Sequence, residues 1–167
     1  LKPDLISLSK GLTGGFLPMG VTMSSKKISE GFLGEDPKQT FWHGHSFTAN
    51  PLGCAAANAS LDLLERSPQK YLDFESRHLP HLQKIVNDPR IECPRITGTI
   101  AAFNIKVKGK KGYLSSVGKI IKASALKTGV FIRPLGDVVY LMPPLCITDE
   151  ELEKCYFGIR EGLNSLP

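Results

Sequence analysis

Apolar and polar positions along the first third of the chain predict two short strands and one long helix. Alternation of side-chain character favours strands at residues 4–9 and 20–24, with the glycine-rich stretch 10–15 between them. Ser25 is placed to cap a short helix that ends near residue 31. Asn50 followed by Pro51 is typical of a helix start, and we expect this helix to reach about residue 65.

The remainder of the chain changes to a different order of elements. Ser67-Pro68 repeats the helix-start signal and predicts an amphipathic helix with apolar positions up to residue 86. β-prone segments follow at 91–107, and a helix is expected at 117–126 with Gly129 as its C-terminal cap. The pattern then predicts two short strands, 130–133 and 138–142, and a last helix at 148–163 that opens with a capping box of Thr148 and Glu151.

These elements indicate an α/β fold in the first part and α+β in the second, with a boundary between residues 66 and 67. The 167 residues, 41% of them apolar, can bury a sizeable core, and no internal repeat is found. No apolar stretch approaches the roughly 20 residues of a membrane span. The opening residues carry no signal-peptide pattern, and the chain, which starts at Leu1, reads as a piece of a longer protein.

Charge and cysteine content narrow the function classes. The 21 Lys and Arg against 16 Asp and Glu give a net charge of +5, so a nucleic-acid partner has to be weighed. The densest basic run, residues 106–112, contains glycines and no aromatic residue for base stacking, which favours a solvated turn, such as a hairpin tip, over a nucleic-acid patch. The four cysteines form no C-x-x-C pair, so neither a disulfide framework nor a zinc ribbon is predicted, and a cytoplasmic location fits best.

Lys10 is the first candidate for chemistry. It follows a predicted strand and precedes glycines that let a bulky ligand approach the backbone. Burial against apolar walls would lower the pKa of its amine and leave it able to form a Schiff base with an aldehyde cofactor. On this residue alone, a surface lysine in a loop is the more common case.

The segment 41–51 is the second candidate. Ser46 and Thr48 lie just before the capped helix, whose unpaired N–H groups and dipole favour an anion such as a phosphate. His43-x-His45 offers two metal ligands, but two histidines without a carboxylate or cysteine make a poor metal site, and His78-x-x-His81 makes a poorer one. The structural alternative is aromatic packing with satisfied polar groups.

Arg133 and Tyr140 form the third candidate. Arg133 is flanked by strand-forming apolar residues, so it lies either at an exposed strand end or over a pocket, where it needs a carboxylate or phosphate partner. Tyr140, seven residues later, can line the same pocket and offer a hydrogen bond from its hydroxyl. A surface salt bridge and a core tyrosine are the alternative interpretation.

Three stretches together resemble a known family. They are SLSKGLTGGFLPMG at residues 7–20, HGHSFTANPLGCAAA at 43–57 and GVFIRPLGDVVYLMPP at 129–144. In order and spacing they are similar to class III (ω-type) pyridoxal-phosphate aminotransferases. The resemblance implies the C-terminal part of a fold-type I PLP-dependent transferase: residues 1–66 as the end of the large domain with its mixed sheet, and 67–167 as a small α+β domain.

The resemblance also implies a role for each candidate. Lys10 would hold pyridoxal 5'-phosphate as a Schiff base and move a proton between substrate and cofactor, which supplies the electron sink. Ser46, with His45 and Gly44 beside it, would contact the cofactor phosphate, commonly of the partner subunit, so that a homodimer is expected. Arg133 would receive a substrate carboxylate, with Tyr140 and Gly44 at the same pocket.

Within the family, LPMG and RP…YLMPP resemble members that act on 8-amino-7-oxononanoate in biotin synthesis, with S-adenosylmethionine as amino donor. Another ω-aminotransferase, acting on ornithine or an ω-amino acid, is the alternative, and a non-catalytic module that keeps the fold is a third. Family features expected upstream, above all the aspartate that pairs with the pyridinium nitrogen, are absent from these residues. We therefore expect the 167-residue chain by itself to be inactive.

Overall fold

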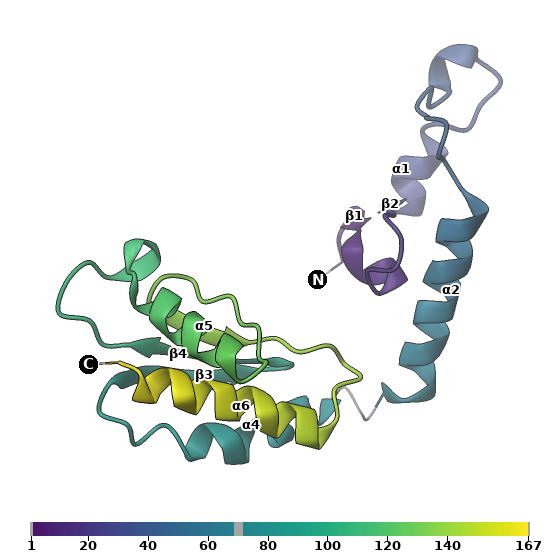
Figure 1. Ribbon diagram of the computed structural model, residues 1–167. Helices are drawn as coiled ribbons and strands as arrows, with labels where there is room; N and C mark the ends of the chain where they lie inside the picture. The colour runs from purple at the N-terminus through teal and green to yellow at the C-terminus, as the bar shows by residue number, and fades with distance from the viewer. Residues whose placement is uncertain (1, 69–71, 167) are drawn as a thin grey trace. The chain divides into compact units, whose positions relative to one another are not determined.

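The computed structural model describes residues 2–68 and 72–166, and the chain divides into two compact units. Unit 1 is Leu1–Pro68 and unit 2 is Gln69–Pro167. Each unit is described by itself below, with the element labels of Figure 1.

Unit 1 contains a two-stranded antiparallel sheet and one long helix. The two strands pair in the register Leu5↔Ser24 to Leu8↔Val21, as expected for short alternating segments. Asn50 caps the long helix, since its Oδ1 accepts the Gly53 N–H at 2.7 Å. The elements are β1 (Leu5–Leu8), η1 (Lys10–Thr13), β2 (Val21–Ser24), α1 (Lys26–Glu30), η2 (Pro37–Gln39) and α2 (Pro51–Arg66).

Ser25 stands at the N-cap position of α1, as predicted, but its side chain makes no capping hydrogen bond. Its hydroxyl donates instead to Asp4 Oδ1 at 3.1 Å, so it ties α1 to the residue before β1.

Few side chains of unit 1 are buried. In the part of unit 1 that the structure describes, only Thr13, Gly53 and Ala57 are buried, where η1 packs on α2. All four residues of β1 are exposed. Many large apolar side chains of the unit are exposed as well, namely Leu5, Ile6, Leu8, Phe16, Met23, Phe32, Leu33, Phe41, Trp42, Phe47, Leu52, Leu61, Leu63 and Leu64. Unit 1 thus has small residues at its one close helix contact and no extended apolar core.

Unit 2 is a three-stranded antiparallel sheet, in the order β3-β4-β5, with three helices packed on it (Figure 1). The predicted helix after Ser67 differs from what is seen. Residues 69–71 lie outside the described part, and the helix that follows ends at Gln83 rather than near residue 86. The elements are α4 (Phe74–Gln83), β3 (Ile91–Thr97), β4 (Ile100–Ile105), η3 (Gly112–Leu114), α5 (Val117–Lys127), β5 (Val138–Leu141) and α6 (Asp149–Asn164).

One face of this sheet carries the core of unit 2. Side chains that share this face come from paired positions, for example Phe103 opposite Val139 and Ile91 opposite Ile105, and all four are buried. Helices α5 and α6 approach closely because Gly162 leaves no Cβ, which would lie 2.5 Å from Ile121 Cγ2. The opposite face holds Glu92, Arg95, Asn104 and Tyr140, none of which is buried. The sheet of unit 2 therefore has one apolar and one open face.

The predicted strand at 130–133 is wrong. Burial alternates there as in a strand, with Val130 and Ile132 buried and Phe131 and Arg133 exposed, but no ladder forms. The Val130 N–H belongs to the end of α5, where it donates to Ala125 O at 3.1 Å, and Gly129 has φ of 81°. Within the described part of the chain, residues 130–133 have no neighbouring strand to pair with, and between them and β5 there is a single bridge, Leu135 with Val138.

The lysine-rich run at 106–112 is an exposed connection rather than a hairpin tip. It joins the end of β4 to η3, whereas the β3–β4 hairpin turns at Gly98, with φ of 54°. Lys106 Nζ donates to Pro89 O at 2.8 Å, and Lys108, Lys110 and Lys111 are exposed. The expected solvated character of the run agrees with these exposures.

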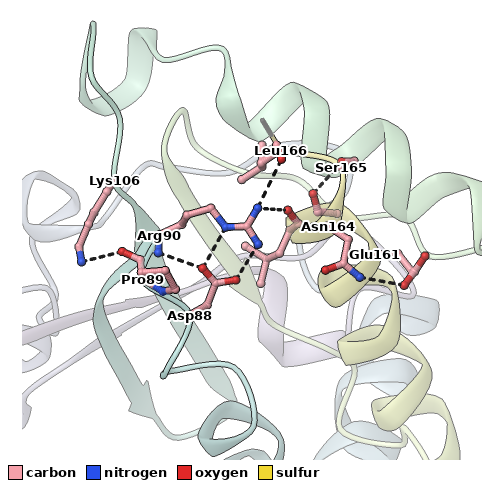
Figure 2. Close-up of polar contacts among 10 residues, drawn as sticks. Asp88, Pro89, Arg90, Lys106, Glu161, Asn164, Ser165 and Leu166 are labelled. Atoms are coloured by element: carbon pink, nitrogen blue, oxygen red, sulfur yellow. Dashed lines mark hydrogen bonds and ion pairs between the residues drawn. The ribbon is translucent and has the colours of Figure 1, made fainter.

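Both ends of α6 are held by side chains. At its start, Thr148 and Glu151 form the predicted capping box. At its end, the Arg90 guanidinium donates to Leu163 O at 2.6 Å and, through two nitrogens, to the Asp88 carboxylate at 2.7 and 2.9 Å (Figure 2). The Arg90 guanidinium lowers the pKa of the Asp88 carboxyl. A positive group at the C-terminal end of a helix also complements the helix dipole.

Candidate functional site

A hollow of about 1250 Å³ lies on unit 1, around the glycine-rich turn that was singled out from the sequence. Three stretches line it: residues 9–10, and parts of residues 15–22 and 41–52. Lys10, Gly44 and His45 are among the lining residues. The structure thus brings the first two predicted groups of site residues to one place within a single unit.

Lys10 is the first residue of η1 and follows directly on β1. Its side chain is exposed, and within the described residues its amine makes no hydrogen bond or ion pair. The amine is therefore available to a ligand in the hollow. In unit 1 the Lys10 side chain and the segments around it are open to solvent.

A tight turn follows Gly44 and fixes His45. The Phe47 N–H donates to His45 Nδ1 at 3.1 Å, and the His45 N–H donates to Thr48 Oγ1, also at 3.1 Å. Because Nδ1 accepts a hydrogen bond, the neutral ring carries its proton on Nε2. His45 thus offers a ring N–H donor, while the hydroxyl of Thr48, a predicted phosphate ligand, already serves the turn.

Ser46 stands at the tip of this turn and differs from its neighbours. Gly44, His45, Phe47 and Thr48 line the hollow, whereas Ser46 does not. Its side chain is exposed, and its hydroxyl has no hydrogen-bond partner among the residues that the structure covers. The structure therefore does not place Ser46 beside Lys10 of the same chain.

The other polar groups near α2 are engaged in local structure. Asn50 lines the hollow and takes the Gly53 N–H, which leaves fewer free N–H groups for an anion than the sequence suggested. The His43 ring packs on Phe41, with ring centroids 5.6 Å apart. Across residues 2–68 and 72–166, no three His, Cys, Asp or Glu side chains gather into a metal site.

Arg133 and Tyr140 belong to unit 2 and flank one turn. Leu135 and Val138 form an antiparallel bridge that closes this turn. Arg133 lies two residues before the bridge in the sequence, and Tyr140 lies two residues after it. Arg133 is exposed, without a salt bridge in the described part of the chain, and Tyr140 is half-buried on the open face of the sheet. Neither the surface salt bridge nor the core tyrosine is seen among the described residues, and the role of Arg133 and Tyr140 in a substrate pocket stays a prediction.

A second polar cluster is buried in unit 2 around His78. Its Nε2 lies 3.0 Å from Thr99 O and its Nδ1 lies 2.8 Å from the Tyr156 hydroxyl. Since a carbonyl only accepts, Nε2 carries the proton and Tyr156 donates to Nδ1. Burial lowers the pKa of His78, and burial also raises the pKa of Tyr156 well above its ordinary value. Both ring nitrogens are used, so His78 has no free lone pair for a metal.

Sequence reasoning missed two kinds of residue at the hollow. The apolar lining residues Leu17, Met19 and Leu52 carried no signal of their own, since such side chains are usually core. Thr13, buried behind the hollow, was passed over as part of a flexible turn. A threonine directly before two glycines was the available signal, because a hydroxyl there can bond to the turn it opens.

Comparison with known proteins gives one consistent result. The aminotransferase class-III family matches residues 1–163. Among curated relatives, the adenosylmethionine-8-amino-7-oxononanoate aminotransferase of Synechococcus elongatus is 46% identical over 166 residues, which is 99% of the chain and 39% of that relative. The enzyme of the same name from Geobacter sulfurreducens is 35% identical over 177 residues, covering 99% of the chain and 38% of the relative.

Solved structures agree with the sequence relatives. The crystal structure of the adenosylmethionine-8-amino-7-oxononanoate aminotransferase of Methanocaldococcus jannaschii has a TM-score of 0.81 at 32% identity, over 96% of this chain and 39% of that one. An amine transaminase from an uncultivated Pseudomonas species, in its PLP-bound form, has a TM-score of 0.81 at 27% identity, over 97% of this chain and 38% of that one.

The chain spans about two fifths of the length of the relatives that it matches. The predicted fold class, an α/β C-terminal portion of a fold-type I PLP-dependent transferase, is confirmed by these structures. In the described part of the chain, no helix combines the length and apolar character that a membrane crossing requires. With a match over residues 1–163, the chain belongs to the class-III aminotransferase family.

Proposed function

We propose that this chain forms part of a pyridoxal 5'-phosphate-dependent aminotransferase that converts 8-amino-7-oxononanoate to 7,8-diaminononanoate, with S-adenosylmethionine as amino donor, in biotin biosynthesis. The observation that carries the proposal is the 46% identity, over nearly the whole chain, to a relative named for this reaction. Relatives of the same name at 32–38% identity from six further organisms point the same way.

The hollow of unit 1 fits this cofactor. It offers an exposed primary amine on Lys10, a ring N–H donor on His45, and Gly44, which has no side chain to keep a ligand from the backbone. When bound, pyridoxal phosphate supplies an electron sink for the substrate carbon that loses a proton. Lys10 would hold this group through its amine and, when the amine is free, would act as the base that moves the proton.

Ser46 supports a shared phosphate site. Its exposed hydroxyl stands at the tip of a turn that is fixed by His45 and Thr48, and it does not line the hollow of its own chain. A hydroxyl in this position can reach a phosphate held by a second subunit. We therefore assign Ser46 to the cofactor phosphate across a homodimer, while His45 lines the hollow of its own chain.

Arg133 and Tyr140 suit the recognition of a substrate carboxylate. Arg133 is exposed and carries no acidic partner among the described residues, and a guanidinium can hold a carboxylate by two parallel hydrogen bonds. Tyr140 lies on the open sheet face, at the end of the same turn. Arg133 and Tyr140 would orient a long keto acid by its distal carboxylate.

Another class III ω-aminotransferase is the second candidate. Its support is the amine transaminase structure that matches with the same TM-score as the biotin-pathway enzyme, 0.81. In either case we expect small-molecule substrates and a cytoplasmic enzyme, since all four cysteines are free.

The proposed reaction is tested with the full-length protein that contains these residues. With S-adenosylmethionine and 8-amino-7-oxononanoate, the keto acid should disappear, and borohydride should fix the cofactor to Lys10. Lys10→Ala should abolish both, by at least about 10³-fold in rate. Turnover of ornithine or another ω-amine in place of S-adenosylmethionine would favour the second candidate, and turnover by Lys10→Ala at the wild-type rate would refute both.

A further inference from the structure

The buried hydroxyl of Thr13 carries an inference about the turn that presents Lys10. Thr13 is 4% exposed and is the only buried residue of η1. It does not line the hollow, whereas Lys10 and Leu17, on either side of it in sequence, both do. Thr13 is therefore placed behind the turn, on the side where η1 packs on α2.

The side chain of Thr13 closes this turn with two hydrogen bonds. Its Oγ1 donates to Leu17 O at 2.6 Å and accepts the Leu17 N–H at 3.3 Å. One hydroxyl thus satisfies both backbone groups of the same residue, four positions ahead. Such a clamp fixes where the chain leaves the glycine-rich turn.

The rest of the turn depends on that closure. Gly14 and Gly15 have φ of 60° and 83°, a backbone conformation that glycine adopts readily because it has no Cβ, and no side chain of their own can fix them. The Gly15 N–H donates to Lys10 O at 3.2 Å, so the backbone of Lys10 is joined to the same loop. Unit 1 has no apolar core that could hold the loop in place of these bonds.

We infer that Thr13 is the positioning residue for Lys10: its hydroxyl clamps the Lys10–Leu17 turn and so holds the exposed amine at the hollow. This rests on the proposed function for the chemical role of Lys10, but not for the clamp itself. Thr13 touches neither cofactor nor substrate, and its effect is transmitted through the Gly14-Gly15 backbone.

The test compares Thr13→Val, which keeps the shape of the side chain and removes the hydroxyl, with Thr13→Ser, which keeps the hydroxyl. Amide hydrogen exchange at Leu17 should be about tenfold faster in Thr13→Val and unchanged in Thr13→Ser. Ser25→Ala is the matched control, because it removes a side-chain hydrogen bond of unit 1 away from the hollow. It should leave Leu17 exchange as it is.

A second readout uses pyridoxal 5'-phosphate and borohydride in the longest natural form of the protein, with the modified lysines located by peptide mass spectrometry. Thr13→Val should lower the share of adduct on Lys10, relative to Lys26 and Lys27, by about tenfold. Thr13→Ser should restore that share. A general loss of folding would not be rescued by the smaller serine.

The outcomes separate the proposed aminotransferase function from the positioning role of Thr13. If wild-type protein shows no preference for Lys10, the proposed function fails, while the exchange at Leu17 still decides on the clamp. If Lys10 is preferred and Thr13→Val matches wild type in exchange or in adduct share, the positioning role is refuted. If Thr13→Val does not fold, Thr13→Ser decides: behaviour like wild type supports the role of the hydroxyl, and loss of the Lys10 adduct overturns it.

Discussion

The two units hold their functional groups by different means. Unit 2 places Tyr140 on a sheet whose one face is packed with buried side chains such as Phe103, Val139 and Leu152, and Arg133 on the segment that leads to this strand. Unit 1 presents Lys10 on a turn that is held by backbone hydrogen bonds and one buried hydroxyl. Its large apolar side chains are mostly exposed.

The unit that carries Lys10 buries much less apolar surface within its own residues than unit 2 does. Burial of apolar area is the main source of folding stability, and unit 2 has it within its own residues. Exposed apolar surface on the scale of unit 1 is typical of faces that other protein surface covers. Unit 1 also leaves the Lys10 side chain exposed, on a turn with no apolar core behind it among the described residues.

The largest expected difference between the units concerns their aromatic side chains. Phe74 is fully buried in unit 2, and Phe16 is 81% exposed in unit 1. Phe74→Ala should lower the free energy of unfolding of unit 2 by about 3–5 kcal/mol, since it leaves a cavity. Phe16→Ala should change it by less than about 0.5 kcal/mol. Urea unfolding followed by amide exchange in β4 measures both, and similar losses would contradict the contrast.

The second prediction is a pH dependence confined to unit 2. Burial holds the pKa of His78 below its ordinary 6.5, with Arg77 and His81 adding positive charge nearby. As the pH decreases, the unfolded chain therefore binds a proton at His78 before the folded chain does. The contribution of the neutral His78 to the free energy of unfolding is complete above pH 6.5. It decreases as the pH drops below 6.5, by up to about 1.4 kcal/mol per pH unit.

The histidine variant sharpens this prediction. His78→Gln should remove that slope, whereas His43→Gln in unit 1, where the ring is exposed, should leave it. Unfolding at a series of pH values checks this, together with the titration of the His78 ring by NMR. The groups that face His78 from the elements around it are Tyr156 of α6, Arg77 and His81 of α4, and the Thr99 carbonyl. Titration of His78 at an ordinary pKa would show that its burial has no such effect.

Ion pairs should show a smaller difference. Arg90 joins Asp88 to the end of α6, and its loss in Arg90→Ala should cost unit 2 about 1–3 kcal/mol, because a carbonyl and a half-buried carboxylate lose their donors. Part of that cost should vanish as the pH falls below the ordinary 3.8 of aspartate, since Arg90 lowers the pKa of Asp88.

The matched pair in unit 1 is Lys26–Glu30, whose side chains are 87% and 56% exposed. Lys26→Ala should cost at most about 0.5 kcal/mol. Chemical denaturation at neutral and acid pH compares the two variants. A loss for Lys26→Ala as large as that for Arg90→Ala would remove the distinction.

The smallest predicted difference concerns helix caps. Thr148 accepts the Glu151 N–H in a complete capping box, so Thr148→Ala should destabilise unit 2 by about 1 kcal/mol. Ser25 makes no capping bond to α1, so Ser25→Ala should cost only about a few tenths of a kcal/mol. Thermal unfolding followed by circular dichroism measures both, and equal effects would mean that the bond to Asp4 serves as a cap.

Much of the fold could be predicted because its signals are local. Both strands of unit 1, the start of α2 at Asn50 and the capping box at Thr148 depend on residues within a few positions of one another. The strand expected at 130–133 failed for the opposite reason. Its alternation was real, but whether it pairs depends on a distant neighbour that only the folded chain supplies.

The sequence by itself determined the family and the three groups of candidate residues, because motif order and spacing are properties of the chain. Only the tertiary structure decided that Lys10 and His45 line one hollow, that Ser46 does not, and that Thr13 is buried behind the turn. The physical reason is that burial and hydrogen-bond partners depend on what packs nearby, and no pattern along the chain records which surfaces meet.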